Sequence, residues 1–85
     1  MTRKEANIYL AAILETLAEG ENGEAPEGIL YAGIATAGAS FGDWQAITNI
    51  LLAGLLCERT PGPCLKLTDK GRKAVERIAE ARATA

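Results

Sequence analysis

The first regular pattern of hydrophobic and polar positions along the chain is a helical one. Thr2 and Glu5 have the spacing of a capping box, in which each side chain accepts a hydrogen bond from the other residue's backbone N–H. Gly20 is typical of the position that follows a helix end. The pattern therefore predicts a helix at residues 3–19, and its apolar face would consist of Leu10, Ile13, Leu14 and Leu17.

A second helix is predicted at residues 26–37. Pro26 suits its first turn, where a missing backbone N–H costs nothing. Gly28 and Gly33 keep this helix thin, at about 1 kcal/mol for each interior glycine relative to alanine. Its predicted apolar contacts are Ile29, Leu30, Ile34 and Ala37.

The third predicted helix, at residues 41–56, has the clearest two-sided pattern. Ser40 and Asp43 repeat the capping-box spacing at its start. The stripe predicted to be buried consists of Trp44, Ile47, Leu51 and Leu55, with Ile50 beside it. The face predicted to point outward carries Gln45, Thr48 and Asn49.

The periodicity changes from helical to alternating in residues 57–67, which we predict to be a β-hairpin. Pro61 and Gly62 indicate the turn, because proline presets φ and glycine accepts positive φ. In the segment C-L-K-L that follows, leucines alternate with other residues, as in a strand with one buried face. Pairing Cys57 opposite Leu65 would bury Cys57 and leave Cys64 on the outer face. This register favours reduced thiols over a direct disulfide between the two cysteines, and so a cytoplasmic protein.

Thr68 can cap a closing helix at residues 69–82, with Val75, Ile78 and Ala79 as its apolar stripe. A helix, a Pro-Gly hairpin and a closing helix opened by L-T-D-K-G resemble the C-terminal half of a winged-helix domain of the transcription-regulator type. The resemblance covers about half the chain. It implies an α+β, mostly α, fold over residues 1–85: three helices, a two-stranded hairpin wing and a C-terminal helix. The strand that usually lies between the first two helices is not visible in the sequence.

The resemblance implies that residues 41–56 are a recognition helix that enters the DNA major groove. Gln45, Thr48 and Asn49 would then read bases, and Arg59 and Lys66 on the wing would contact phosphates of double-stranded DNA. A homodimer would strengthen the binding of such a weakly charged module. The distribution of charge opposes this reading, because residues 5–58 hold eight acidic and no basic residues, within a net charge of −2. The alternative is a winged-helix module for protein–protein interaction or dimerisation that does not bind DNA.

Few residues offer other chemistry. The chain has no histidine and a single serine, Ser40, so we expect no enzymatic activity, no metal site and no cofactor. Residues 33–40 match a phosphate-binding loop except that Ala39 replaces the lysine, and no strand precedes them. The charge-free segments 28–42 and 44–57 are too short and too polar for a membrane hairpin, and the charged N-terminus predicts no signal peptide.

Overall fold

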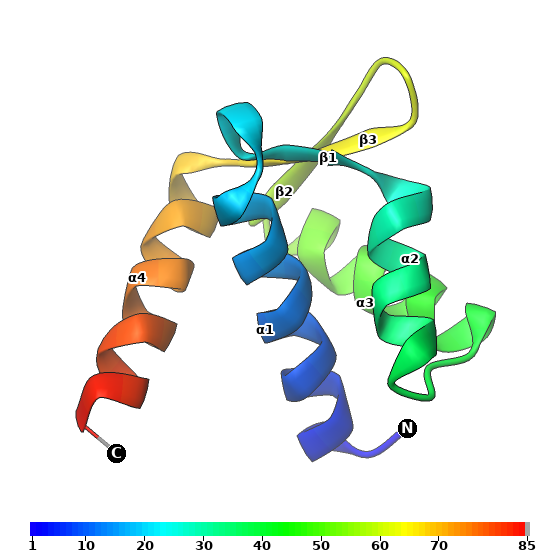
Figure 1. The fold of residues 1–85 in the computed structure, drawn as a ribbon, viewed down its shortest axis with the longest axis horizontal. Helices are drawn as coiled ribbons and strands as arrows, with labels where there is room; N and C mark the ends of the chain where they lie inside the picture. Colours follow the sequence, from blue (N-terminus) through cyan, green and yellow to red (C-terminus); the bar gives the residue numbers. More distant parts are fainter. Residues whose placement is uncertain (85) are drawn as a thin grey trace.

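The computed structural model describes residues 1–84 and shows an α+β fold that is mostly helical (Figure 1). The first three helices are α1 (Arg3–Glu19), α2 (Glu27–Thr36) and α3 (Phe41–Ala53), and the chain ends in α4 (Asp69–Thr84). A single 3-10 turn, η1 (Glu21–Gly23), follows α1. Three short strands, β1 (Glu24–Pro26), β2 (Cys57–Thr60) and β3 (Cys64–Leu67), form an antiparallel sheet in the order β1-β3-β2. The order of elements is winged-helix-like.

The strand β1 is the main element that the sequence pattern does not predict. It has only three residues, and Glu24 and Ala25 lie opposite Lys66 and Leu65 of β3. No alternation can be read from so short a segment, because its conformation is set by pairing with a distant strand. Pro26 ends this strand and serves as the cap of α2, one position before the helix rather than in its first turn.

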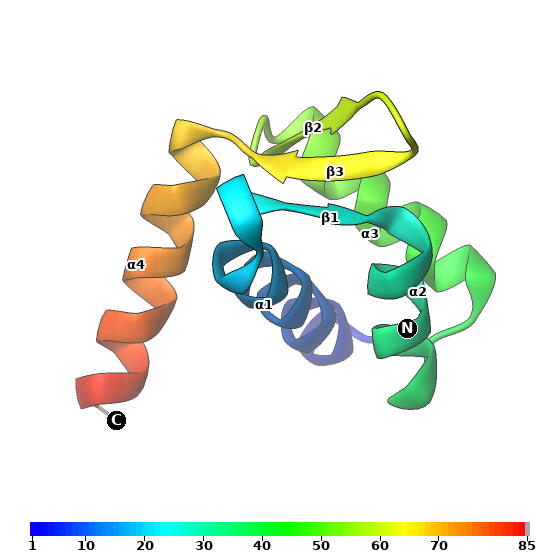
Figure 2. The same ribbon diagram turned by 45° about the horizontal axis from the view of Figure 1, so that its top comes forward.

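The core lies where α1, α3 and the sheet meet. Its centre consists of side chains at most 1% exposed: Ile13, Leu17, Ile47, Leu51 and Leu65. Figure 2 shows the sheet along one side of the helical body, with α2 leaving from the end of β1 and α4 from the end of β3. Leu30 and Ile34 of α2 join the same buried cluster. The predicted apolar face of α1 is confirmed in outline, since Ile13, Leu14 and Leu17 are all buried.

The third helix ends three residues earlier than predicted, at Ala53. The N–H of Leu55 donates to the Leu52 carbonyl at 3.1 Å, and that of Leu56 donates to the Leu51 carbonyl at 3.0 Å. These are the two bonds of a Schellman motif. The motif requires a left-handed residue, and Leu55 takes that role with φ of 58°. The prediction that Leu55 is buried is therefore wrong: its side chain leaves the helical stripe and is 66% exposed.

The hairpin has the predicted extent but a different register. Cys57 lies opposite Leu67, not Leu65, because three residues form the turn and Thr60 pairs with Cys64. The register shifts by two residues, so each side chain keeps its predicted face. Cys57 is buried, Cys64 is partly exposed, and both are free thiols.

The segment L-T-D-K-G fixes the start of α4 through its threonine and glycine. The hydroxyl of Thr68 accepts a hydrogen bond from the Gly71 N–H at 3.0 Å and donates to the Leu55 carbonyl. The Thr68 N–H donates to the Leu56 carbonyl at 3.1 Å. The beginning of α4 is thus bonded directly to the turn that ends α3. This explains why threonine and glycine stand at these two positions.

Candidate interaction surface on α3 and the hairpin

The helices α2 and α3 follow one another along the chain and are joined by the short turn of residues 37–40. The Ser40 hydroxyl accepts from the Asp43 N–H at 3.1 Å, and an Asp43 carboxylate oxygen accepts from the Ser40 N–H at 2.9 Å. The bond from the Ser40 N–H is the main reason that the pKa of Asp43 is lowered. The start of α3 therefore carries a fixed negative charge.

Two of the three polar residues predicted to face outward on α3 do so. Gln45 and Asn49 are exposed and lie one helical turn apart. Thr48 is only 2% exposed, so the prediction that it faces outward is wrong. It follows Trp44 by four residues and therefore shares the buried side, where its hydroxyl donates to the Trp44 carbonyl at 2.7 Å.

Beyond Asp43 in its first turn, the outward face of α3 is uncharged and partly apolar. Small or amide residues occupy its centre: Gly42, Ala46, Asn49 and Ala53. Ile50 at its edge is 46% exposed and Leu55 beyond the helix end is 66% exposed, although both were predicted to lie with the buried stripe. The stripe narrows because the Schellman turn removes Leu55 from the helix. Phe41, which sequence reasoning did not single out, is 56% exposed.

Phe41 belongs to a small aromatic cluster at the start of α3. Its ring meets Tyr31 of α2 edge to face, with 5.5 Å between centroids and an interplanar angle of 86°. Tyr31 also lies 6.0 Å from the Trp44 ring, which is buried. The cluster packs α2 against α3, and Phe41 remains more than half exposed.

The two wing cations are each placed beside carboxylates. The Arg59 Nε lies 3.6 Å from a carboxylate oxygen of Glu27, at the start of α2. Lys66 occupies the central strand, directly opposite Glu24 on one side and Glu58 on the other. Of the five residues predicted to contact DNA, only Gln45 and Asn49 share the outward face of α3. Thr48 lies in the core, and Arg59 and Lys66 have acidic neighbours.

The charged side chains of α2 and α3 are all acidic. Neither α2 nor α3 contains a lysine or an arginine, whereas Glu27 and Asp43 lie at their starts. Exposed cations lie outside these two helices, at Lys70, Lys73 and Arg77 of α4 and at Arg3 and Lys4 near the start of α1. A surface of this kind repels phosphate where a recognition helix would need to approach it.

The described residues provide little for metal or thiol chemistry. Residues 1–84 contain no group of three or more histidine, cysteine or acidic side chains arranged to hold a metal ion. Burial raises the pKa of Cys57 to about 11, which keeps this thiol protonated near neutral pH. The residues of the phosphate-loop-like segment 33–40 finish α2 and form the capped turn into α3.

No family model, no curated protein and no solved structure matches this chain at a significant level. Among the helices of residues 1–84, none is both long and apolar enough to cross a membrane.

Proposed function

We infer that this winged-helix-like domain binds another protein, and that the outward face of α3 is part of its contact surface. One observation carries this proposal: beyond Asp43 in its first turn, the outward face of α3 as far as Ala53 has no charged side chain, and Phe41, Ile50 and Leu55 around it are about half or more exposed. Protein contact surfaces are depleted of charge at their centre and enriched in aromatic and apolar anchors.

The electrostatics support a protein partner over a nucleic acid. Each phosphate contact in a DNA complex normally comes with a cation, and these contacts supply much of the affinity. The pair α2–α3 contributes two carboxylates and no cation, and Glu27 competes with phosphate for Arg59. An apolar protein surface could contact the uncharged centre of α3 without removing a charged group from water.

DNA binding is the second candidate, and one observation favours it. Gln45 and Asn49 are exposed one turn apart on α3, and both amides can form paired hydrogen bonds with adenine. The flanking wing would then contact the backbone through Arg59 and Lys66. Under this alternative the protein would act as a regulator-like dimer, because one weakly charged module binds poorly alone.

A site-specific crosslinking experiment tests the first proposal. A photo-crosslinking amino acid replaces Ile50 in the protein expressed in its own cells, and a matched variant carries it at Glu80, which is exposed on α4. We expect a crosslinked polypeptide at position 50 and not at position 80. Adding A46E at the centre of the face should abolish the crosslink, since it buries an unpaired charge. Equal crosslinking at both positions, or none at position 50, contradicts the proposal.

The alternative is tested with a labelled random duplex, whose fluorescence anisotropy is followed during titration with protein in salt from about 20 mM upward. We expect no binding even at the lowest salt concentration. Binding that weakens steeply with salt and is lost in Q45A/N49A would instead establish DNA recognition by α3.

A further inference from the structure

The exposed side of α1 carries a second regular stripe, separate from its buried face. Its members recur at alternating intervals of four and three residues: Lys4, Ile8, Ala11, Glu15 and Ala18. This is the spacing of a heptad seam, which lets two helices pack along their length. Ile8 lies in the first half of the helix and is 55% exposed. A single exposed isoleucine would not by itself indicate a contact surface.

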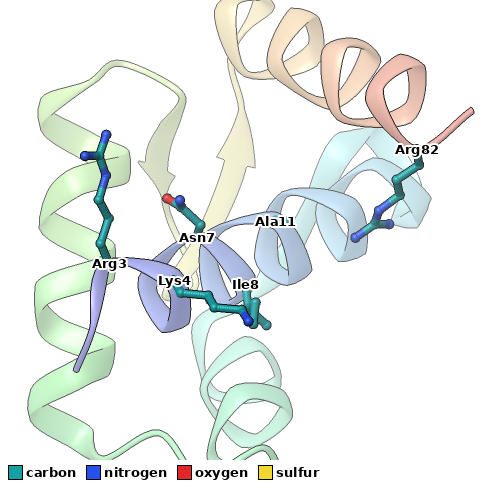
Figure 3. Close-up of a pocket in the computed structure, with 6 residues that line it drawn as sticks. All are labelled: Arg3, Lys4, Asn7, Ile8, Ala11 and Arg82. Atoms are coloured by element: carbon teal, nitrogen blue, oxygen red, sulfur yellow. The ribbon is translucent and has the colours of Figure 1, made fainter. Parts of the chain in front are cut away.

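Shallow hollows surround this stripe and make it a continuous face. One of about 560 Å³ is lined by Lys4, Ile8, Ala11 and Arg82 together with Arg3 and Asn7 (Figure 3). A second, of about 420 Å³, continues along α1 past Ile8 and Ala12 to Glu15 and Glu19. In Figure 3, Lys4 extends along α1 beside Ile8, and Arg82 reaches toward α1 from the end of α4.

The charges of this face have opposite signs at its two ends. Arg3 and Lys4 lie at the N-terminal end of α1, whereas Glu15 and Glu19 lie toward its C-terminal end. The alanines between them, Ala11 and Ala12, allow another helix to approach closely. A surface with this arrangement is complementary to itself when a second copy is turned by a two-fold axis.

We propose that this face binds a second copy of the chain, with the two α1 helices packed antiparallel. In the register that follows from the heptad spacing, Ile8 packs against the partner's Ala11, and Lys4 lies beside the partner's Glu15. Each of these contacts occurs twice because of the two-fold symmetry. The Arg82 guanidinium already binds Glu15 within one chain, so the carboxylate would lie between two cations in the dimer.

The charges also select the direction of packing and the nature of the partner. Parallel helices would place Lys4 against Lys4 and Glu15 against Glu15, whereas the antiparallel arrangement places Lys4 of each chain beside the partner's Glu15. An unrelated partner would have to reproduce this sequence of charges, but a second copy carries it already. The proposal does not rest on the α3 surface, which belongs to a different helix. Because each seam has only one large apolar residue, we expect a weak dimer that forms only at high protein concentration.

Sedimentation velocity of the full chain between about 1 µM and 1 mM tests the proposal. The mass should rise with concentration from the 8.9 kDa of one chain toward twice that value. I8E should weaken the dimer by about tenfold or more, because it places an unpaired charge in the seam. The matched control I50E changes an isoleucine of similar exposure on α3 and should leave the dimer intact.

A charge swap identifies the register. K4E alone would set glutamate against glutamate, and E15K alone would set lysine against lysine, so each variant should be monomeric. An equimolar mixture of the two should dimerise again, because each Glu then faces a Lys. A monomeric wild-type chain at about 1 mM, or failure of the mixture to associate, would overturn the proposal. A dimer dissolved by I50E and not by I8E would also overturn it and would move self-association to the α3 surface.

Discussion

Gly71 lies directly against the backbone carbonyl of Leu56: a Cβ atom built on Gly71 would be 2.0 Å from that oxygen. No L-residue with a side chain fits there unless the start of α4 moves away from the end of α3. The Thr68 hydroxyl and N–H bind the same turn, so this junction joins the helical body to the sheet and α4. The L-T-D-K-G segment thus packs the start of α4 directly against the turn that ends α3.

G71A should therefore destabilise the fold by about 3 kcal/mol, as expected for overpacking against backbone that cannot move aside. The matched control is G33A in α2, where nothing lies within 4 Å of the added methyl group. That change should stabilise the protein by about 0.5–1 kcal/mol through helix propensity. Urea unfolding of both variants measures the two effects, and a G71A variant as stable as wild type would contradict the tight contact.

Leu55 should be a suboptimal residue at its position. Its φ of 58° lies in the left-handed region, which costs a non-glycine residue about 1–2 kcal/mol, and its exposed side chain recovers little of that through packing. L55G should raise the stability by about 0.5 kcal/mol after the entropy of the unfolded glycine is subtracted. L55V should lower it, since β-branched residues resist positive φ. The order Gly, Leu, Val in melting temperature checks this, and the reverse order would refute a left-handed residue 55.

The residue patterns predict the fold class, the hairpin and the cap residues because these depend on neighbours in sequence. The capping boxes at Thr2 and Ser40 form as predicted, since each needs only residues three apart. Features that depend on contacts between residues far apart in the sequence cannot be predicted from such local patterns. The strand β1 exists because β3 pairs with it, and the end of α3 is set by a left-handed leucine where glycine is expected.

The candidate surfaces were harder to predict than the fold. The polarity of Thr48 favours an outward position, although its spacing from Trp44 puts it on the buried side. The acidic neighbours of Arg59 and Lys66 cannot be predicted from the sequence pattern, because they come from other strands and from α2. The helical spacing of Lys4, Ile8, Ala11 and Glu15 could have been read from the sequence, but the exposure of that face could not.

The two cysteines should differ in reactivity. Burial raises the pKa of Cys57 from its ordinary 9.0 to about 11, and Cys64 is partly exposed at the end of the turn. At about pH 8, a thiol reagent should therefore modify Cys64 quickly and Cys57 only as the chain unfolds. C64S should remove the fast reaction, whereas C57A should leave it unchanged. Fast modification of both thiols would contradict the burial of Cys57.

The same pKa predicts how stability depends on alkaline pH. The folded state favours the neutral Cys57 thiol over the thiolate. The stability that results from this preference is fully present below about pH 9 and is lost as the pH rises toward about 11. C57A lacks the group, so the difference in unfolding free energy between wild type and C57A should narrow across that range. A difference that stays constant with pH would show that Cys57 ionises as easily in the folded state as in the unfolded one.

Lys66 should mainly stabilise the sheet, because it lies between glutamates on the two neighbouring strands. Glu24 and Glu58 lie directly opposite it on the neighbouring strands, and opposed charges of this kind contribute about 0.2–1 kcal/mol per pair. K66E would place three carboxylates in a row across the sheet and should destabilise the fold by about 1–2 kcal/mol, less at high salt. K73E, which reverses an exposed charge on α4, is the control and should change stability by less than about 0.5 kcal/mol. Thermal unfolding at low and high salt separates the two outcomes. Equal, small effects of both variants would mean that Lys66 is free to serve an external partner, as the DNA-binding alternative requires.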